Sequence, residues 1–376
     1  MTIQGFGTGA AIARRDFLKT SSGVAAAAAF GAFSLPAFAA YVPPSRQRGS
    51  KVISVKDYGA AGNGSKDDTA AIQAAINALP SAGGTVTIPA GTYLIDPTRY
   101  VRLRSNMHLK MSPDAILKAK TCSVKRSYIL LISDRSNVEI SGGQLVGDRA
   151  THVYSGGGTH EWGHGIQILG GRYVTVRDLR VSKCTGDGVC IGGNSNDVVI
   201  ANIVSTGNRR QGLSITNCAN VKVYDSEFSY TQGTSPECGI DIEPDPGHSC
   251  SNIRIENCRM NNNKRYGLNI WKNVSTVTVA KSVMERNGSL GMSTYGCSGI
   301  TVTGNTVRYN SATGIVYNDG TRNVVHSGNT SYGNYTRLGT KTRTPFTLTG
   351  WSSKIERDIL LRGSRSNVSI RTNSYR

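Results

Sequence analysis

The sequence predicts an all-β fold: a single-stranded right-handed parallel β-helix, which is a solenoid, with a short N-terminal capping helix. The first observation is a Gly-apolar-x-apolar phrase that recurs every 23 to 28 residues. A repeat of this length indicates a solenoid, and the alternation of apolar residues is typical of a strand. The glycines of the phrase are Gly165, Gly188, Gly212, Gly239, Gly267, Gly291 and Gly314.

The second observation is an apolar pair that follows each glycine at a steady offset, such as Val174/Val176 and Val277/Val279. No amphipathic helix fits between phrase and pair, which argues against ankyrin and tetratricopeptide repeats. The third is an asparagine four residues before several of the glycines, where stacked amides can hydrogen-bond from coil to coil. These asparagines are Asn208, Asn263, Asn287 and Asn310. One coil per repeat, with strands about 4.8 Å apart, accounts for all three.

The N-terminal segment has the features of an export signal rather than of the repeat. The pair Arg14-Arg15 precedes an alanine-rich apolar run, Val24–Phe38, and Ala37-Phe38-Ala39 fits a signal-peptidase site. We expect residues 1–39 to be a twin-arginine signal peptide that exports the folded chain to the periplasm or beyond. No later segment has the roughly 18 apolar residues needed to span a bilayer.

The remaining chain divides by composition. A helix from about Ala70 to Leu79, capped by Asp68 or Thr69, would cover the open end of the solenoid. The predicted segments are a linker over 40–50, the β-helix over 51–345 and a C-terminal capping segment over 346–376.

The opening of the repeat region resembles the entry segment of the pectate-lyase superfamily, which includes polygalacturonase-related and rhamnogalacturonase-like right-handed β-helix proteins. The matching residues are Asp57-Tyr58-Gly59-Ala60, Gly64, Asp67-Asp68-Thr69-Ala70-Ala71-Ile72 and the run from Gly84 to Tyr93. The resemblance continues as repeats to about Asn334 and implies a carbohydrate-active enzyme outside the cytoplasm. Lyases, hydrolases, C5-epimerases and phage tailspikes share this fold, so the reaction stays open.

The net charge indicates which partners the protein binds, and the cysteine pattern indicates whether it forms disulfides or binds a metal. The chain has 43 Lys and Arg against 24 Asp and Glu, a formal net charge of +19. Such a surface favours polyanions, and for an exported protein we expect an acidic polysaccharide. No basic run interleaved with aromatics suggests nucleic acid. We expect a monomer that is free of the membrane once the signal is removed. Most of the eight cysteines should be buried thiols, with a Cys250–Cys258 bridge left open and no Cys-x-x-Cys metal pattern.

The best candidate for a catalytic strand carries Asp241 and Glu243. If the first and third residues after each glycine point inward, the second and fourth form outward rows, and these two are the only acids in those rows. Their Cα atoms should be about 6.7 Å apart. Insertions over 231–237 and 244–249 flank this strand, as binding loops of repeat proteins do. With Asp245, the two acids could hold Ca²⁺ if the protein is a lyase; otherwise we expect no cofactor.

Neighbouring coils supply further candidates. Turns of the two coils on either side of Asp241 could grip substrate carboxylates, and exposed aromatics could stack on sugar rings. A glycine-rich loop leads into the first phrase with three histidines in thirteen residues, which suits acid–base chemistry better than a metal. The expected substrate-binding residues are Arg209, Gln211, Lys264, Arg265, Tyr266, Trp271, Tyr295, His160 and Trp162. The expected catalytic residues are Asp241, Glu243, Asp187, His164 and Arg210.

Three reaction classes fit these residues. β-Elimination from a uronate needs a base for the C5 proton and a cation for the carboxylate. Hydrolysis needs two carboxyl groups about 5 to 9.5 Å apart, but the motif set of polygalacturonases is absent in its usual order. A uronate C5-epimerase and a non-catalytic polysaccharide-binding protein remain alternatives. The sequence slightly favours elimination, because the basic surface suits uronates.

Overall fold

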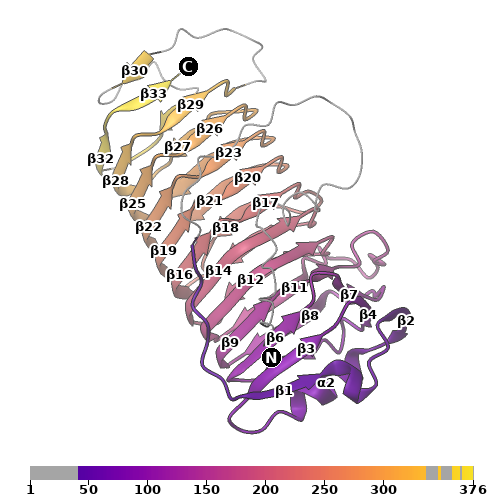
Figure 1. Cartoon of the computed structure of the whole chain (residues 1–376). Helices are drawn as coiled ribbons and strands as arrows, with labels where there is room; N and C mark the ends of the chain where they lie inside the picture. Colours follow the sequence, from indigo (N-terminus) through magenta and orange to yellow (C-terminus); the bar gives the residue numbers. More distant parts are fainter. Residues whose placement is uncertain (1–40, 336–345, 349–357, 365, 376) are drawn as a thin grey trace, which may run out of the picture. The chain divides into compact units, whose positions relative to one another are not determined.

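The computed structural model describes residues 41–335, 346–348, 358–364 and 366–375, so the predicted signal peptide lies outside the described part. The described strands are stacked in parallel, one coil upon the next, and their colour in Figure 1 runs in order from indigo at β1 to yellow at β33. One strand, β30, pairs antiparallel. The predicted parallel β-helix is confirmed. Within these residues, no helix has both the length and the apolar character needed to cross a bilayer.

The strands fall into three stacks, two of which share one 23-stranded sheet because β12 and β14 bend through both. The first stack comprises β1 (Lys51–Ser54), β3 (Gly84–Ile88), β6 (Met107–Met111), β9 (Ser136–Ser141), β12 (Arg172–Ser182), β14 (Ser195–Thr206), β16 (Cys218–Tyr224), β19 (Cys250–Glu256), β22 (Val274–Ala280), β25 (Ser298–Thr303), β28 (Arg322–Ser327) and β32 (Ser366–Ile370). The second comprises β2 (Asn63–Asp67), β4 (Gly91–Ile95), β7 (Ala115–Ala119), β10 (Gln144–Val146), the ends of β12 and β14, β17 (Glu227–Ser229), β20 (Arg259–Asn261), β23 (Val283–Glu285), β26 (Thr306–Arg308), β29 (Thr330–Tyr332) and β33 (Asn373–Tyr375), along which β30 (Phe346–Leu348) runs.

The third stack is a separate ten-stranded sheet, and it contains the glycine phrases. Its strands are β5 (Val101–Arg102), β8 (Arg126–Ser133), β11 (Trp162–Leu169), β13 (Val189–Gly192), β15 (Leu213–Ile215), β18 (Ile240–Ile242), β21 (Leu268–Trp271), β24 (Met292–Tyr295), β27 (Ile315–Tyr317) and β31 (Ile359–Leu361).

The phrase glycine is required because two coils meet there. A Cβ on Gly239 would lie 2.7 Å from the carbonyl oxygen of Gly267 in the next coil. The residues one and three positions later, Ile240 and Ile242, are fully buried in the interior. The repeat therefore combines a close backbone approach with two core side chains, which explains why glycine and the alternating apolar residues recur together.

Buried asparagines link successive coils, as the sequence predicts. The amide of Asn263 donates to Oδ1 of Asn287 (3.0 Å), and the amide of Asn287 donates to Oδ1 of Asn310 (2.9 Å). The ladder continues to Asn334 (2.9 Å). Toward the N-terminus, Thr231 takes the place of an asparagine and donates to Oδ1 of Asn263, so Asn208 stands apart from the continuous run.

Replacing Asn287 with alanine should lower the free energy of unfolding by about 3 to 5 kcal/mol. The change removes the acceptor of the backbone N–H and of one side-chain N–H of Asn263, and it removes a donor to the carbonyl of Met260; each lost buried hydrogen bond of this kind costs about 1 to 3 kcal/mol. Chemical denaturation measures the loss. Asn318→Ala removes a single bond to Ser293 and should cost about 1 kcal/mol or less; equal losses in the two variants would contradict the ladder's role.

The predicted capping helix is present as α2 (Thr69–Asn77), preceded by the 3-10 turn η1 (Val55–Tyr58). It lies at the N-terminal end of the stack in Figure 1 and buries Ile72 and Ile76. Asp68 is the N-cap by position, but its carboxylate accepts the backbone N–H groups of Ala61 and Gly62 rather than one of the helix. The Asp68 side chain therefore closes the turn before the helix. The sequence pattern does not distinguish this role from that of a helix cap.

The segment predicted as a linker lies along the coils instead. Arg46 donates to Thr175 (2.8 Å) and pairs with Asp197 (2.8 Å), and Arg48 pairs with Glu139 (2.9 Å). Tyr41 stacks on Tyr224 with ring centroids 3.8 Å apart. Figure 1 shows this indigo segment running from β1 toward β16. Its arginines pair with acids on strands far along the chain, of which Glu139 is buried, so the segment is held in place rather than free.

At the other end, strand pairing continues past the last phrase. β31 pairs with β27, β32 with β28 and β33 with β29, so part of the segment predicted as a C-terminal cap adds a further coil. The eight cysteines are free, and six of them are buried. The open bridge between Cys250 and Cys258 is therefore not formed.

Candidate functional site

The ten-stranded sheet carries the outward row that contains Asp241. In register, Ser214 lies beside Asp241, and Asp241 lies beside Asn269 on the following coil. The row predicted from the phrase offset is therefore confirmed as a line of neighbouring side chains. Although it belongs to an outward row, Asp241 is only 2% exposed.

Neighbouring amides enclose the Asp241 carboxylate. Gln211 donates to Oδ2 (2.7 Å) and Asn269 donates to Oδ1 (2.9 Å). The Gln211 amide is itself fixed, because its oxygen accepts the backbone N–H of Cys238 (2.8 Å). Burial raises the pKa of Asp241 to about 7, and the nearby Glu243 carboxylate adds to the rise. Asp241 can thus exchange a proton near neutral pH, which is the property of a general acid or base.

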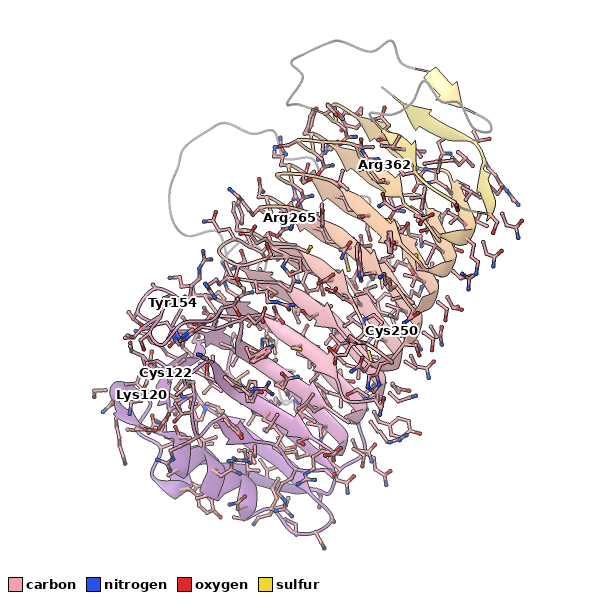
Figure 2. All side chains as sticks on the ribbon, turned by 180° about the vertical axis from the view of Figure 1, so that it is seen from behind. Lys120, Cys122, Tyr154, Cys250, Arg265 and Arg362 are labelled. Atoms are coloured by element: carbon pink, nitrogen blue, oxygen red, sulfur yellow. The ribbon has the colours of Figure 1, made fainter. Side chains whose placement is uncertain are left out.

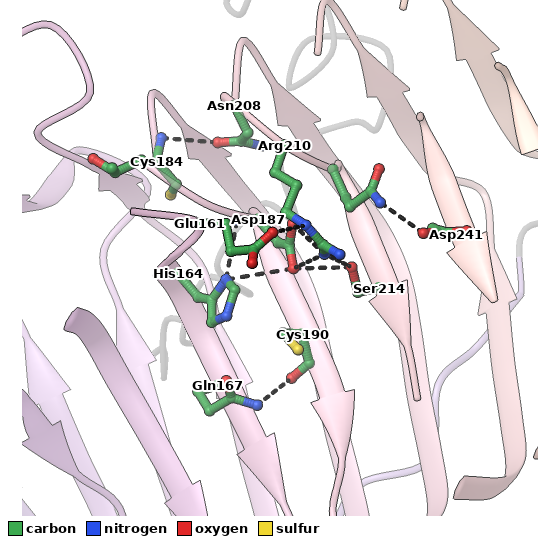
Figure 3. A network of polar contacts seen from close by, with 12 residues as sticks. Glu161, His164, Gln167, Cys184, Asp187, Cys190, Asn208, Arg210, Ser214 and Asp241 are labelled. Carbon is green, nitrogen blue, oxygen red and sulfur yellow. Dashed lines mark hydrogen bonds and ion pairs between the residues drawn. The ribbon is translucent and has the colours of Figure 1, made fainter. Parts of the chain in front are cut away.

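A second polar cluster lies on the coils before Asp241 and is centred on Asp187, which is fully buried. Figure 3 shows Arg210 between this cluster and Asp241. The Arg210 guanidinium lies 3.3 Å from Oδ2 of Asp187, and Ser214 donates to the same oxygen (2.9 Å). On its other side, Nε of Arg210 lies 3.2 Å from Glu161, close enough for an ion pair but without hydrogen-bond geometry.

The charge of Arg210 is set by its surroundings. Burial by itself would lower the pKa of Arg210, but Asp187 and the other carboxylates around it outweigh burial and raise the pKa above its usual value. The guanidinium therefore stays protonated. This environment suits a cation that binds a substrate carboxylate, and it does not suit a proton acceptor.

His164 is oriented by the same cluster. The backbone N–H of Asp187 donates to Nδ1 of His164 (3.0 Å), so the ring proton of the neutral form lies on Nε2. Burial lowers the pKa of His164, which keeps the ring neutral at physiological pH. No hydrogen bond to Nε2 is present among the described residues. His164 is therefore arranged to offer an N–H to a ligand rather than to remove a proton.

The predicted calcium set is not assembled in this conformation. Within the described chain, the carboxylates of Asp241, Glu243 and Asp245 do not converge within 4.8 Å of one another. Both oxygens of Asp241 accept amide N–H groups, and Asp245 is exposed and accepts from Asn217 (2.6 Å). The short loop after β18 turns the third acid toward a neighbouring coil, which the spacing of the acids did not indicate.

The two basic turns on either side of Asp241, residues 209–211 and 264–266, make different contacts. The Arg209 guanidinium donates to the carbonyl of Thr159 (2.6 Å) and lies over the ring of Tyr154, so it holds the glycine-rich loop. In the other turn, Arg265 lies over its neighbour Tyr266 and donates to its hydroxyl (3.1 Å), whereas Lys264 is exposed. From these two turns, Gln211 contacts Asp241 and Arg210 contacts Asp187.

The predicted aromatic platform is present. Trp271 stacks on Tyr295 of the next coil with ring centroids 4.6 Å apart, and the Lys272 ammonium lies near both rings. The exposed Trp271 ring, stacked on the half-buried Tyr295 ring, suits contact with a sugar face. Trp162 is also exposed and lies beneath the guanidinium of Arg126.

His160 and His164 enter different networks, although four residues separate them in sequence. His160 contacts Nε2 of His152 through Nδ1 (2.9 Å), whereas His164 contacts Asp187. The sequence analysis did not select Ser214, Asn269 or Glu161. The first two belong to the same outward row as Asp241, so the row itself was the signal that could have found them.

Comparison with known proteins agrees with this architecture. The family model described as right handed beta helix region matches residues 108–271 and 237–374, and the model described as rhamnogalacturonase A/epimerase, pectate lyase-like, matches residues 52–137. The uncharacterized protein YclG of Bacillus subtilis (strain 168) is 30% identical over 276 residues, which are 65% of this chain and 47% of that relative. The chain spans about half or less of the length of the curated relatives it matches.

Two solved structures share the fold. The A-module of the mannuronan C-5 epimerase AlgE6 from Azotobacter vinelandii superposes with a TM-score of 0.60 at 20% identity, covering 86% of this chain and 98% of the module. PfbA, a surface adhesin of Streptococcus pneumoniae, superposes with a TM-score of 0.61 at 19% identity, covering 76% of this chain and 85% of that one. The family model for the right-handed β-helix matches most of the stacked coils. This chain therefore belongs to the right-handed β-helix family, with a pectate-lyase-like entry segment.

Proposed function

We propose that this protein is an enzyme that acts on an acidic, uronate-containing polysaccharide and cleaves it by β-elimination. The observation that carries the proposal is the placement of Asp241 beyond the permanently charged Arg210 on an outward sheet face. Asp241 is a buried carboxyl, and burial raises its pKa to about 7. A proton acceptor poised near neutral pH and a fixed cation are the two groups that elimination from a uronate requires.

In the proposed step, these residues account for each proton that moves and each bond that breaks. The Asp241 carboxylate takes the proton from C5 of the uronate, and the electrons of the C5–H bond form the C4–C5 double bond. The C4–O bond breaks, and the departing oxygen receives the proton from Asp241. Arg210 faces the substrate carboxylate and stabilises the negative charge that develops there. His164 donates its Nε2–H to a substrate oxygen, and Trp271 with Tyr295 supports neighbouring sugar rings.

Epimerisation at C5 begins with the same proton removal, so the same groups could support it. The fold shared with the AlgE6 module supports polysaccharide chemistry of this kind. Hydrolysis is the second candidate, and a separate feature favours it. Protonated Asp241 could donate to a glycosidic oxygen while Glu243 acts as the second carboxyl. The Cα atoms of residues two apart on a strand are about 6.7 Å apart, which is compatible with the carboxyl separations used by glycosidases.

One assay separates these reactions. Incubation of the mature protein with a panel of uronate polysaccharides, followed by ultraviolet absorbance of the unsaturated sugar and by reducing ends, should raise both signals if elimination occurs. Reducing ends alone would overturn elimination in favour of hydrolysis. A change in uronate configuration by NMR with neither signal would indicate an epimerase, and binding without turnover would indicate an adhesin-like role, as the fold of PfbA would allow. A parallel incubation with a chelator, followed by return of Ca²⁺, tests whether the reaction needs calcium, as the sequence analysis allowed for a lyase.

Export by the twin-arginine route is part of the proposal, because the substrate lies outside the cytoplasm. Replacing Arg14 and Arg15 with lysine should trap the precursor in the cytoplasm. Cell fractionation measures the effect. Export at the wild-type level would show that the arginine pair is incidental.

A further inference from the structure

Three side chains from distant parts of the sequence converge at the base of the glycine-rich loop. Sγ of Cys122 lies 3.4 Å from Oδ2 of Asp148 and 3.6 Å from Nδ1 of His152, and these last two atoms are 2.9 Å apart. Asp148 and His152 are buried, and Cys122 is half-buried. Figure 2 shows Cys122 and Tyr154 on the same edge of the solenoid. The proposed reaction uses none of these three side chains.

The hydrogen bonds around His152 require one proton more than two neutral imidazoles and an ionised Asp148 supply. Nδ1 of His152 faces the Asp148 carboxylate, its Nε2 faces Nδ1 of His160 (2.9 Å), and Nε2 of His160 faces the carbonyl of Ser155 (2.8 Å). A carboxylate and a carbonyl both accept, so these three contacts need three protons, whereas two neutral imidazoles carry two. A ring or the Asp148 carboxyl carries the third proton, or a cation takes its place beside Asp148.

We propose that Cys122, Asp148 and His152 form a zinc-type divalent metal site. Thiolate, carboxylate and imidazole are the ligands that zinc takes. Tetrahedral zinc with usual bond lengths separates such ligand atoms by roughly 3.3 to 3.6 Å. Both sulfur distances already match, and the His152–Asp148 distance needs to open by about 0.4 Å. Three protein ligands leave the fourth position to water or another small ligand.

The outer contacts fit a metal-bound His152. With the metal on Nδ1, Nε2–H of His152 donates to His160, and Nε2–H of His160 donates to Ser155, so both rings are neutral and every ring nitrogen has a partner. A second partner that orients a ligating histidine is a regular feature of metal sites. Asp148 is held by Thr185 (2.8 Å) through its other oxygen, whereas Oδ2 accepts the backbone N–H of Cys122 (3.1 Å) and has a second lone pair for the metal.

A second cluster, His164, Asp187 and Cys190, also brings three potential ligand atoms together, but its charges disfavour a cation. The Arg210 guanidinium already lies 3.3 Å from Asp187, and Nδ1 of His164 is occupied by a backbone N–H. No ion pair to Asp148 from a lysine or arginine is present among the described residues. The positive charge that the Asp187 cluster obtains from arginine is therefore still missing at Asp148.

The metal would fix the loop beside the proposed reaction site. Gly156 and Gly157 adopt positive φ values and have no other atoms close to the position of a Cβ, so the loop has few contacts of its own there. The carbonyl of Thr159 in this loop accepts from Arg209, which adjoins Arg210. Burial, with help from Asp148, raises the pKa of Cys122 to about 11. Metal binding would release this thiol proton, so we expect the metal affinity to rise with pH.

The test uses the mature chain stripped with a chelator and loaded with Co²⁺ or Zn²⁺. We expect one metal per chain, a rise in melting temperature with Zn²⁺, and a sulfur-to-cobalt charge-transfer band with Co²⁺. Cys122→Ser should remove the band, whereas Cys297→Ser, a matched change of a buried thiol, should keep it. His160→Ala should weaken zinc binding about 10- to 100-fold, as loss of an orienting partner does.

Three outcomes would overturn the site. Loss of the band in Cys190→Ser but not in Cys122→Ser would place the metal at the His164 cluster. Failure of the wild-type chain to bind either metal, with an imidazolium signal at His152 or His160 by nitrogen NMR, would show that a proton supplies the charge. X-ray absorption of the metal-loaded wild-type chain guards against a variant that fails to fold, because a metal without a sulfur neighbour would refute the proposal directly.

Discussion

Replacing Asp241 with asparagine is expected to lower the turnover number about 10²- to 10⁴-fold, the usual contribution of a positioned acid or base. The asparagine keeps the size of the side chain, and the Asn269 amide can rotate to accept from it, so the packing of β18 should survive. Parallel ultraviolet and reducing-end assays measure the loss. Asp114→Asn, which neutralises an exposed acid after β6, should leave turnover unchanged.

The same substitution should stabilise the protein at high pH. The pKa of Asp241 is about 7 in the folded chain and about 4 in an unfolded one. Between these values the unfolded chain releases a proton that the folded chain retains, so the free energy of unfolding of the wild type falls as the pH rises. The loss amounts to about 4 kcal/mol by pH 8. Asp241→Asn does not titrate and should therefore melt higher than the wild type at pH 8, but not at pH 4.

The pH dependence of turnover distinguishes the two roles open to Asp241. A proton acceptor requires the carboxylate, so elimination should increase as the pH rises through about 7. A proton donor requires the acid, so hydrolysis should decrease over the same range. Glu243→Gln removes the carboxylate that adds to the raised pKa, and it should move either limb to lower pH. An Asp241→Asn variant with wild-type turnover and wild-type melting behaviour would remove Asp241 from the site.

The second large effect is expected at Arg210. Arg210→Lys should lower kcat/KM about 10²- to 10³-fold, since loss of one preorganised donor to a developing charge has effects of this size. Lysine keeps the charge but cannot hold Asp187 and a substrate carboxylate with one planar group. Arg209→Lys, the same change at the adjacent residue, should retain far more activity because Arg209 binds loop carbonyls.

A double variant separates catalysis from folding at Arg210. Arg210→Ala alone leaves Asp187 as a buried charge without its partner and should cost about 3 kcal/mol or more of stability. Adding Asp187→Asn removes that charge, so the double variant should regain stability but remain inactive. If the double variant recovered both stability and activity, Arg210 would be only a counter-ion for Asp187. Thermal unfolding and kcat/KM on the same preparations provide the two readouts.

The sequence by itself determined the solenoid. Each coil repeats the same close backbone contact at a glycine and the same pair of inward side chains, so the period is visible in one chain without its coordinates. The outward row that joins Ser214, Asp241 and Asn269 follows from that period, because register in stacked parallel strands is set by the coil length. The stacking of Trp271 on Tyr295 follows for the same reason.

The tertiary structure alone decided what the turns do, because turn residues vary in number and do not follow the period. It directs Arg210 toward Asp187 while Arg209 binds the loop, and it places His160 and His164 in different networks. It also decides burial, which depends on side chains from neighbouring coils. Neighbouring coils close over Asp241, and this burial raises its pKa to about 7 although the Asn269 amide stabilises the carboxylate, whereas its place in the sequence shows only an acid on an outward row.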